Sequence, residues 1–135
     1  MSLAFTSFFP WRRELDGYNP LIEGGRFTVF IDEAKLKEIV GRLVAAVDPD
    51  RIIMFGSRAR GDAKADSDLD LLIVKDSDEP RHRRAIPAYR ALSGLGIPTD
   101  IIWRTAVEIG DWAQVPNHVT TRAIREGRVL YERAA

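Results

Sequence analysis

The sequence predicts an α/β fold of the α+β kind, in which helices cover a small mixed β-sheet. Short apolar runs rich in β-branched residues occupy residues 51–55, 69–74 and 97–103. Segments in which apolar residues recur at helical spacing alternate with these runs, an order typical of a sheet covered by helices. The 135 residues, of which 45% are hydrophobic and 30% charged, suffice for one globular domain with a single core.

Residues 1–31 differ from the rest of the chain in composition. They contain seven of the twelve aromatic residues, namely Phe5, Phe8, Phe9, Trp11, Tyr18, Phe27 and Phe30. Pro10, Pro20 and a pair of glycines interrupt any long periodic pattern. Two interpretations stand side by side: an aromatic-rich arm that packs on the domain or on a partner, and an irregular extension that covers part of the core. Residues 27–31 are a candidate edge strand, and the domain proper then spans 32–135.

The first half of the domain begins with an amphipathic helix. Asp32 is a good N-cap, and the apolar residues behind it recur at helical spacing until Asp48. A strand over 51–55 follows and stops at Gly56, where we expect Ser57 to cap a short helix that runs through 59–60. The next strand, 69–74, is apolar on both faces, which favours a place in the interior of the sheet.

The second half continues the alternation. Residues 80–92 read as an arginine-rich helix that is kinked at Pro87 or begins there. After a third strand over 97–103, Thr105 and Glu108 have the spacing of a capping box and open a short helix. A last helix over 117–126 ends at Gly127, and residues 129–131 are a candidate final strand.

Composition excludes several classes of protein. Basic and acidic residues number 20 each, so the chain lacks the basic excess of proteins that coat nucleic acid. The absence of cysteine excludes disulfides and thiolate metal sites. The longest apolar run is far shorter than a membrane span, and the arginines near the N-terminus follow the apolar residues instead of preceding them as in a secretion signal. We therefore expect a cytoplasmic protein without membrane contact.

The turn after the first strand has the residues of an anion site. Glycine at position 56 lets the backbone approach a bulky anion, and the first amides of a helix attract negative charge. Ser57 adds a hydroxyl, and Arg58 and Arg60 add charge-assisted bonds within reach of a phosphate. The pattern predicts a triphosphate cradle, although glycine-serine alone is a weak signal.

Three aspartates supply candidate metal ligands. Asp68 and Asp70 open a strand with a spacing of two, so both carboxylates point to one face. Asp100 lies in an otherwise apolar strand and joins them if the two strands are neighbours. Hard carboxylate oxygens suit Mg²⁺. A pair of such ions can activate an attacking hydroxyl and stabilise a leaving pyrophosphate. The alternatives are a solvated strand entry for the first two residues and an arginine partner for Asp100.

A calcium loop over the neighbouring aspartates is excluded by three of its positions. Lys64 takes the third ligand position, Ser67 replaces the turn glycine, and Ile73 replaces the bidentate glutamate.

Together these motifs resemble a known family. The sequence GSRARG at 56–61 followed by SDLD at 67–70 is similar to the signature of the polymerase-beta-type nucleotidyltransferases. The closest branch is that of the minimal nucleotidyltransferases (MNT), which resemble the catalytic domain of kanamycin nucleotidyltransferase. The segment AIREGRVLYE at 123–132 also resembles the end of that domain. The likeness covers residues 32–132 and implies the nucleotidyltransferase-type fold.

The resemblance implies roles for individual residues. Gly56 and Ser57 would bind the triphosphate, with Arg60 supporting the phosphate loop. Asp68 and Asp70 would bind two Mg²⁺ ions, and Asp100 would be the third metal-binding carboxylate. The reaction would move a nucleoside monophosphate, AMP if the nucleotide is ATP, to an acceptor hydroxyl and release pyrophosphate.

The resemblance also implies a partner. Small members of the family often act as antitoxins beside a helical HEPN ribonuclease, and some adenylylate that partner on tyrosine. Only about 30 residues lie outside the core here, too few for an acceptor domain, so another chain must hold or be the acceptor, as part of a homo- or hetero-oligomer. The competing hypotheses are a non-catalytic antitoxin or binding module that neutralises a partner by contact, and a modifier of small molecules such as aminoglycosides.

Overall fold

Four strands form the main sheet in a computed structural model, which describes residues 22–23, 26–27, 31–64 and 67–134. The strands are β3 (Arg51–Phe55), β4 (Leu69–Val74), β5 (Thr99–Arg104) and β6 (Arg128–Glu132), in the order β5-β4-β3-β6. Strand β3 runs antiparallel to both β4 and β6, whereas β4 and β5 are parallel. The sheet is therefore mixed, as predicted.

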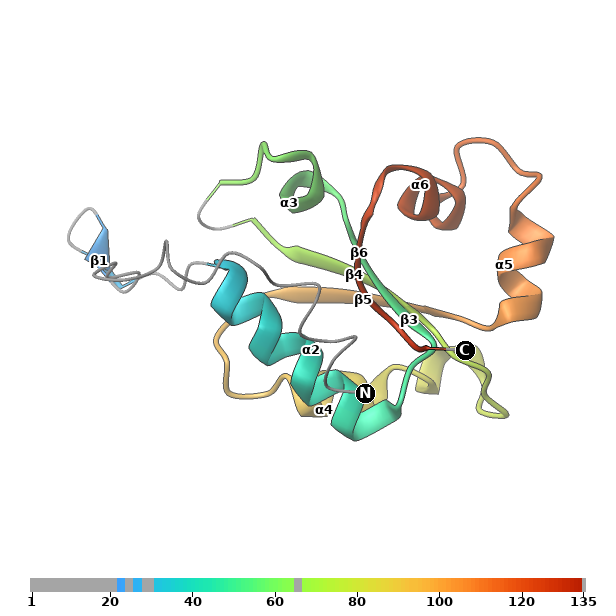
Figure 1. The fold of residues 1–135 in the computed structure, drawn as a ribbon, viewed down its shortest axis with the longest axis horizontal. Helices are drawn as coiled ribbons and strands as arrows, with labels where there is room; N and C mark the ends of the chain where they lie inside the picture. Colours follow the sequence, from blue (N-terminus) through green and yellow to red (C-terminus); the bar gives the residue numbers. More distant parts are fainter. Residues whose placement is uncertain (1–21, 24–25, 28–30, 65–66, 135) are drawn as a thin grey trace.

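Helices cover both faces of this sheet. Helices α2 (Glu33–Val47) and α4 (Ile86–Ala91) pack on one face, and α5 (Ala106–Trp112) and α6 (Val119–Glu126) lie on the other (Figure 1). Strand β4 serves both layers because its side chains alternate: Leu71 and Ile73 face the α2 side, while Leu72 and Val74 face the α6 side. All four side chains are buried, which confirms the prediction of an interior strand.

Helix α2 begins and ends where the local sequence indicates. The Asp32 side chain accepts a hydrogen bond of 2.8 Å from the Lys35 amide, and Asp48 ends the helix with a left-handed φ of 49°. Its apolar stripe, which includes Ile39 and Leu43, is buried against the sheet. Local capping and periodicity were therefore sufficient to predict this element.

The helix expected over 80–92 is divided in two. A 3-10 turn, η2 (Arg81–Arg83), precedes α4, and Pro87 lies in the first turn of α4. Proline removes an amide donor that the first turn does not use, so the helix begins at this point instead of running through it. Of the two outcomes predicted for Pro87, the second is the one observed.

The C-terminal elements follow the expected order. Thr105 and Glu108 form both hydrogen bonds of a capping box at the start of α5. Helix α6 ends at Gly127, whose position allows β6 to pair with β3 directly afterwards. A Cβ atom at residue 127 would lie 2.3 Å from the Ala123 carbonyl oxygen and 2.8 Å from that of Met54, so only glycine fits between α6 and β3.

The N-terminal segment is described only in part. Strands β1 (Ile22–Glu23) and β2 (Arg26–Phe27) form a separate antiparallel pair. Residues 28–30 of the edge strand predicted over 27–31 lie outside the described residues; of its ends, Phe27 pairs with β1 and Ile31 packs against the main core outside any strand. The aromatic arm predicted over 1–31 otherwise falls outside the described residues.

In the part of the chain that is described, no helix has both the length and the apolar character needed to cross a bilayer.

Candidate active site

Two of the predicted aspartates lie side by side on the sheet. The register pairs Asp70 of β4 with Asp100 of the parallel strand β5, and pairs Asp70 with Phe55 of the antiparallel strand β3. Paired residues of adjacent strands project to the same face. The row Asp100, Asp70 and Phe55 therefore lies on the face that α5 and α6 cover. Along β4, Asp70 is the next residue on this face after Leu72, two positions away. The condition under which Asp100 could join the other aspartates, that the two strands are neighbours, is therefore met.

The third carboxylate belongs to the same end of the sheet. Asp68 lies two residues before Asp70 and just ahead of β4, and is exposed, as is Asp100, whereas Asp70 is partly buried. Burial raises the pKa of the Asp70 carboxyl, the negative charges of Asp100 and Asp68 raise it further, and Arg60 opposes them. Asp70 is thus close enough to each of the other two carboxylates to be repelled by it.

Gly56 brings this acidic end of the sheet against the turn that follows β3. Its backbone has φ 76° and ψ −157°, a region open essentially to glycine alone. A Cβ atom at this position would lie 2.2 Å from Asp70 Oδ2, so the carboxylate rests directly on the backbone of residue 56. The sequence predicted close approach of this backbone to a bound anion, whereas the group that it approaches in the structure is the side chain of Asp70.

Ser57 has a different place from the one expected. It is the first residue of α3 (Ser57–Arg60), and Gly56 is the N-cap. The prediction that Ser57 caps this helix is therefore wrong: the backbone of Gly56 already makes the turn, and the cap has no side-chain hydrogen bond. The carbonyl of Ser57 accepts from the amides of Gly61 and Asp62, which closes the short helix at its other end.

The two arginines of α3 have unlike environments. The Arg58 guanidinium donates to the Ser67 carbonyl from Nε at 3.2 Å and from the terminal nitrogen NH2 at 2.7 Å. Burial lowers the pKa of Arg58, and the charge of Asp68 opposes that shift. Arg58 thus braces the segment that carries Asp68, a role that sequence reasoning missed when it assigned this side chain to phosphate. Arg60 is exposed, with Nε 3.4 Å from Asp62 Oδ2.

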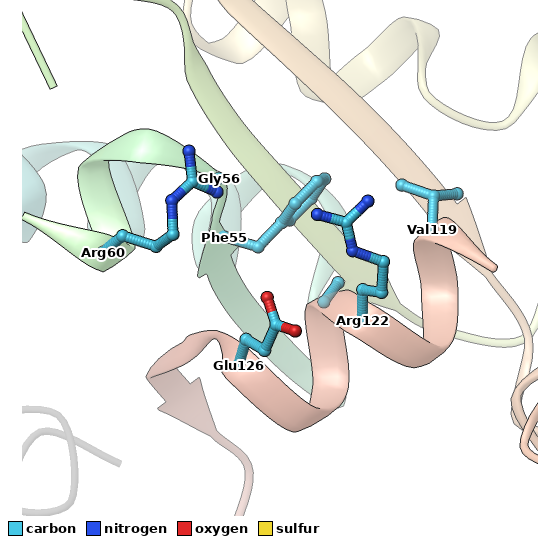
Figure 2. A pocket seen from close by; sticks show the side chains of 7 residues that line it. Phe55, Gly56, Arg60, Val119, Arg122 and Glu126 are labelled. Carbon is cyan, nitrogen blue, oxygen red and sulfur yellow. The ribbon is translucent and has the colours of Figure 1, made fainter. Parts of the chain in front are cut away.

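A pocket of about 130 Å³ lies beside Gly56, between α3 and α6 (Figure 2). One side is lined by Phe55 of β3, Gly56, and Arg60 of α3, and the other by residues of α6, namely Val119, Arg122, Ala123 and Glu126. The α6 residues recur at spacings of three, four and seven, so they share one face of the helix. That spacing was visible in the sequence, but nothing in it indicated that this face meets the glycine-serine turn.

The donor set fits a divalent cation that arrives with its substrate. Within the described ranges, no three acidic or histidine side chains converge into a preformed metal cage. Mg²⁺ does not require one, since it commonly binds through one or two carboxylates together with substrate phosphates and water. Adjacent carboxylates on Asp70 and Asp100, with Asp68 within electrostatic range, supply such oxygens.

The chain is similar to a known protein family and, in its fold, to several solved structures. The profile of a family described as nucleotidyltransferase domain matches residues 33–129. A solved structure from Sulfolobus solfataricus, provisionally assigned as a nucleotidyltransferase, is 24% identical with a TM-score of 0.51, and the match covers 73% of this chain and 79% of that one. A toxin-antitoxin structure with AMP-PNP is 18% identical with a TM-score of 0.53, over 73% of both chains. A mutant of the MntA-HpeT toxin-antitoxin is 15% identical with a TM-score of 0.50, again over 73% of both chains. No curated protein sequence matches the chain.

Proposed function

Because the chain belongs to the nucleotidyltransferase domain family, we propose that it transfers AMP from ATP to a hydroxyl group on an acceptor molecule. The observation that carries this proposal is the register of β4 and β5, which sets Asp70 beside Asp100 and against the backbone of Gly56. A nucleotide held at Gly56 and Ser57 has its phosphates next to these carboxylates.

In this proposal the residues divide into two groups. Gly56 and Ser57 hold the triphosphate, and Arg60, which is exposed at the pocket edge, adds positive charge to it. Asp68, Asp70 and Asp100 hold Mg²⁺, with two ions expected. When bound, the metal neutralises phosphate oxygens and makes the acceptor hydroxyl easier to deprotonate.

The chemistry is a displacement at the α-phosphorus. The acceptor oxygen forms a bond to that phosphorus, the bond between it and the oxygen bridging to the β-phosphorus breaks, and pyrophosphate leaves with the electron pair. Asp100 is the carboxylate placed to accept the hydroxyl proton, because it is the outermost of the row. Strand β5 is an edge of the main sheet and Asp100 is exposed, so a macromolecular acceptor can reach this carboxylate.

Similarity to toxin-antitoxin structures supports a protein as the acceptor. The fold is shared with toxin-antitoxin structures, one of which carries AMP-PNP. We extend the proposal to an antitoxin that modifies a helical HEPN-type partner on a hydroxyl such as that of tyrosine.

The test measures transfer of the labelled AMP group to an acceptor protein. ATP labelled in the adenine is incubated with Mg²⁺, the protein and a HEPN-type helical protein, and label on the acceptor is followed by mass spectrometry. Asp70→Asn should abolish transfer, while Asp111→Asn, a matched change at an exposed residue of α5, should leave it unchanged. Equal transfer by wild type and Asp70→Asn excludes the proposed site.

A second candidate function is neutralisation of a partner by contact alone. The similarity to toxin-antitoxin structures supports it as well as it supports an enzyme. In that case the double variant Asp68→Asn/Asp70→Asn still neutralises the partner in a growth or ribonuclease assay. If that variant fails to neutralise although it binds with wild-type affinity, neutralisation depends on transfer and the contact hypothesis is rejected.

A further inference from the structure

The pocket between α3 and α6 concentrates positive charge next to the proposed site. Two of its lining side chains are arginines, Arg60 from α3 and Arg122 from α6, and one is acidic, Glu126. The pocket therefore carries a formal charge of +1 from these three residues. Figure 2 shows the Arg60 and Arg122 side chains reaching toward Phe55 from the two helices. Among the described residues, neither Arg122 nor Glu126 forms an ion pair, so both side chains remain available to a ligand.

The order of the strands places this pocket at the opposite end of the site from Asp100. Asp100, Asp70 and Phe55 form a row across β5, β4 and β3, and α6 packs on β3 beyond the end of that row. Attack and departure at a phosphorus atom occur in line, with the entering and leaving oxygens on opposite sides. If the acceptor enters beside Asp100, the leaving group departs past Gly56 toward α6.

We propose that this pocket is the binding site of the β- and γ-phosphates of the nucleotide, and hence of the departing pyrophosphate, with Arg122 as its second phosphate ligand beside Arg60. The inference rests on the proposed function and adds α6 to the site. An arginine donates charge-assisted hydrogen bonds to phosphate, often in pairs. Arg122 is exposed at the pocket mouth, where a flexible side chain closes over a bound anion.

Glu126 should act on a bound phosphate in the opposite sense to Arg122. Its carboxylate lies one helical turn after Arg122 and faces the same pocket. A phosphate in the pocket is repelled by this charge, so Glu126 favours release of pyrophosphate. If the pocket instead held a nucleobase, Glu126 would accept hydrogen bonds from its amino group, and its removal would weaken binding.

The experiment measures binding by calorimetry in the presence of Mg²⁺ at constant salt concentration. The ligands are α,β-methylene-ATP, which cannot be cleaved at the reacting bond, inorganic pyrophosphate, and AMP, which lacks the β- and γ-phosphates. The variants are Arg122→Ala, Arg122→Lys and Glu126→Gln. Arg125→Ala is the matched control, since Arg125 is an exposed arginine of α6 that does not line the pocket. Urea unfolding of each variant confirms that it is folded.

Each variant has an expected result. Arg122→Ala weakens binding of α,β-methylene-ATP and of pyrophosphate about tenfold, the effect of losing a hydrogen bond to a charged group, and leaves AMP binding unchanged. Arg122→Lys loses less, because it keeps the charge without the paired donors. Glu126→Gln tightens binding of the two polyphosphates roughly two- to five-fold through loss of repulsion. Arg125→Ala behaves as the wild type.

Three results overturn the inference. Unchanged polyphosphate binding by Arg122→Ala excludes this residue as a ligand. Equal weakening of AMP and α,β-methylene-ATP, or weaker binding by Glu126→Gln, assigns the pocket to the nucleoside end of the substrate. If the wild-type protein binds none of the three ligands, the proposed function fails, and the inference fails with it.

Discussion

Replacement of Gly56 by alanine tests the contact on which the proposed site depends. Two penalties add at this residue. The backbone region of φ 76° and ψ −157° costs a residue with a side chain about 1–3 kcal/mol. The new methyl group would also lie 2.2 Å from Asp70 Oδ2 and must displace that carboxylate, an overpacking cost of about 1–3 kcal/mol. We expect Gly56→Ala to lower the free energy of unfolding by about 2–6 kcal/mol, a large part of the total for a small domain.

Two other glycines of the chain separate these penalties. Gly61 has φ 86° but no atom within 4 Å of an added Cβ, so Gly61→Ala carries backbone strain alone, about 1–2 kcal/mol. Gly41 lies in α2 with the same open space and no unusual φ, so Gly41→Ala should stabilise the protein by about 0.5–1 kcal/mol. The expected order of stability is Gly41→Ala, wild type, Gly61→Ala and Gly56→Ala.

The assay is equilibrium urea unfolding, completed by a double-mutant cycle. Combining Gly56→Ala with Asp70→Ala removes the group that the new methyl would strike, so the double variant should recover about 1–3 kcal/mol relative to the sum of the single changes. The backbone strain remains in the double variant. If Gly56→Ala costs no more than Gly61→Ala, or if the cycle shows no coupling, the contact between Gly56 and Asp70 is refuted.

Three further predictions concern the surroundings of the site. Burial alone would raise the pKa of Glu108, but hydrogen bonds from the Thr105 backbone, Arg84 and Arg81 lower it from 4.5 to about 2. The shift corresponds to a contribution of at most about 3 kcal/mol to the free energy of unfolding, and of about 1–2 kcal/mol after solvent screening. Because the folded-state pKa is depressed, this stability is present above pH 4.5 and is lost as the pH falls toward 2; Glu108→Gln should therefore unfold more readily at pH 7 and show a flatter loss of stability in acid, and an unchanged acid profile would contradict the assignment. Arg58→Ala should speed amide hydrogen exchange around Ser67, and the loss in binding free energy for α,β-methylene-ATP should exceed the loss in free energy of unfolding. If these amides exchange as slowly in the variant as in the wild type, Arg58 does not brace the segment. Tyr89→Phe removes the hydroxyl that accepts a 2.8 Å hydrogen bond from the Ile101 amide, so stability should fall by about 1 kcal/mol and exchange at that amide should rise, whereas unaltered exchange would show the bond to be dispensable.

Elements with local signals were predicted well. Helix α2 has its cap at Asp32 and its apolar stripe within one segment, and the capping box of α5 lies within four residues. For Pro87, in the first turn of α4, the sequence predicted two possible outcomes, a kinked helix or a helix start, because the effect of a proline depends on its own missing amide and ring. Apolar runs likewise marked β3, β4 and β5 to within two residues at each end.

The site could be predicted only as far as it depends on such local signals. The spacing of Asp68 and Asp70 predicts that they share a face. Whether Asp100 joins them depends on which strands pair, and pairing is set by contacts distant in the sequence. The α6 pocket depends on the packing of residues 119–126 over β3, about 65 residues earlier. The contact of Arg58 with the Ser67 carbonyl was not predicted, because no side-chain pattern in the sequence reveals a backbone partner.

The pairing of β6 with β3 has a consequence for how the protein is made. Strand β6 comes last among the described elements, yet it covers an edge of a strand synthesised near the beginning of the domain. While the chain emerges from the ribosome, the aliphatic stretch Ile52, Ile53 and Met54 therefore has one bare hydrogen-bonding edge until residues 128–132 arrive. A bare apolar edge invites pairing with other chains, so a stalled or shortened nascent chain is the form of this protein most in need of a chaperone.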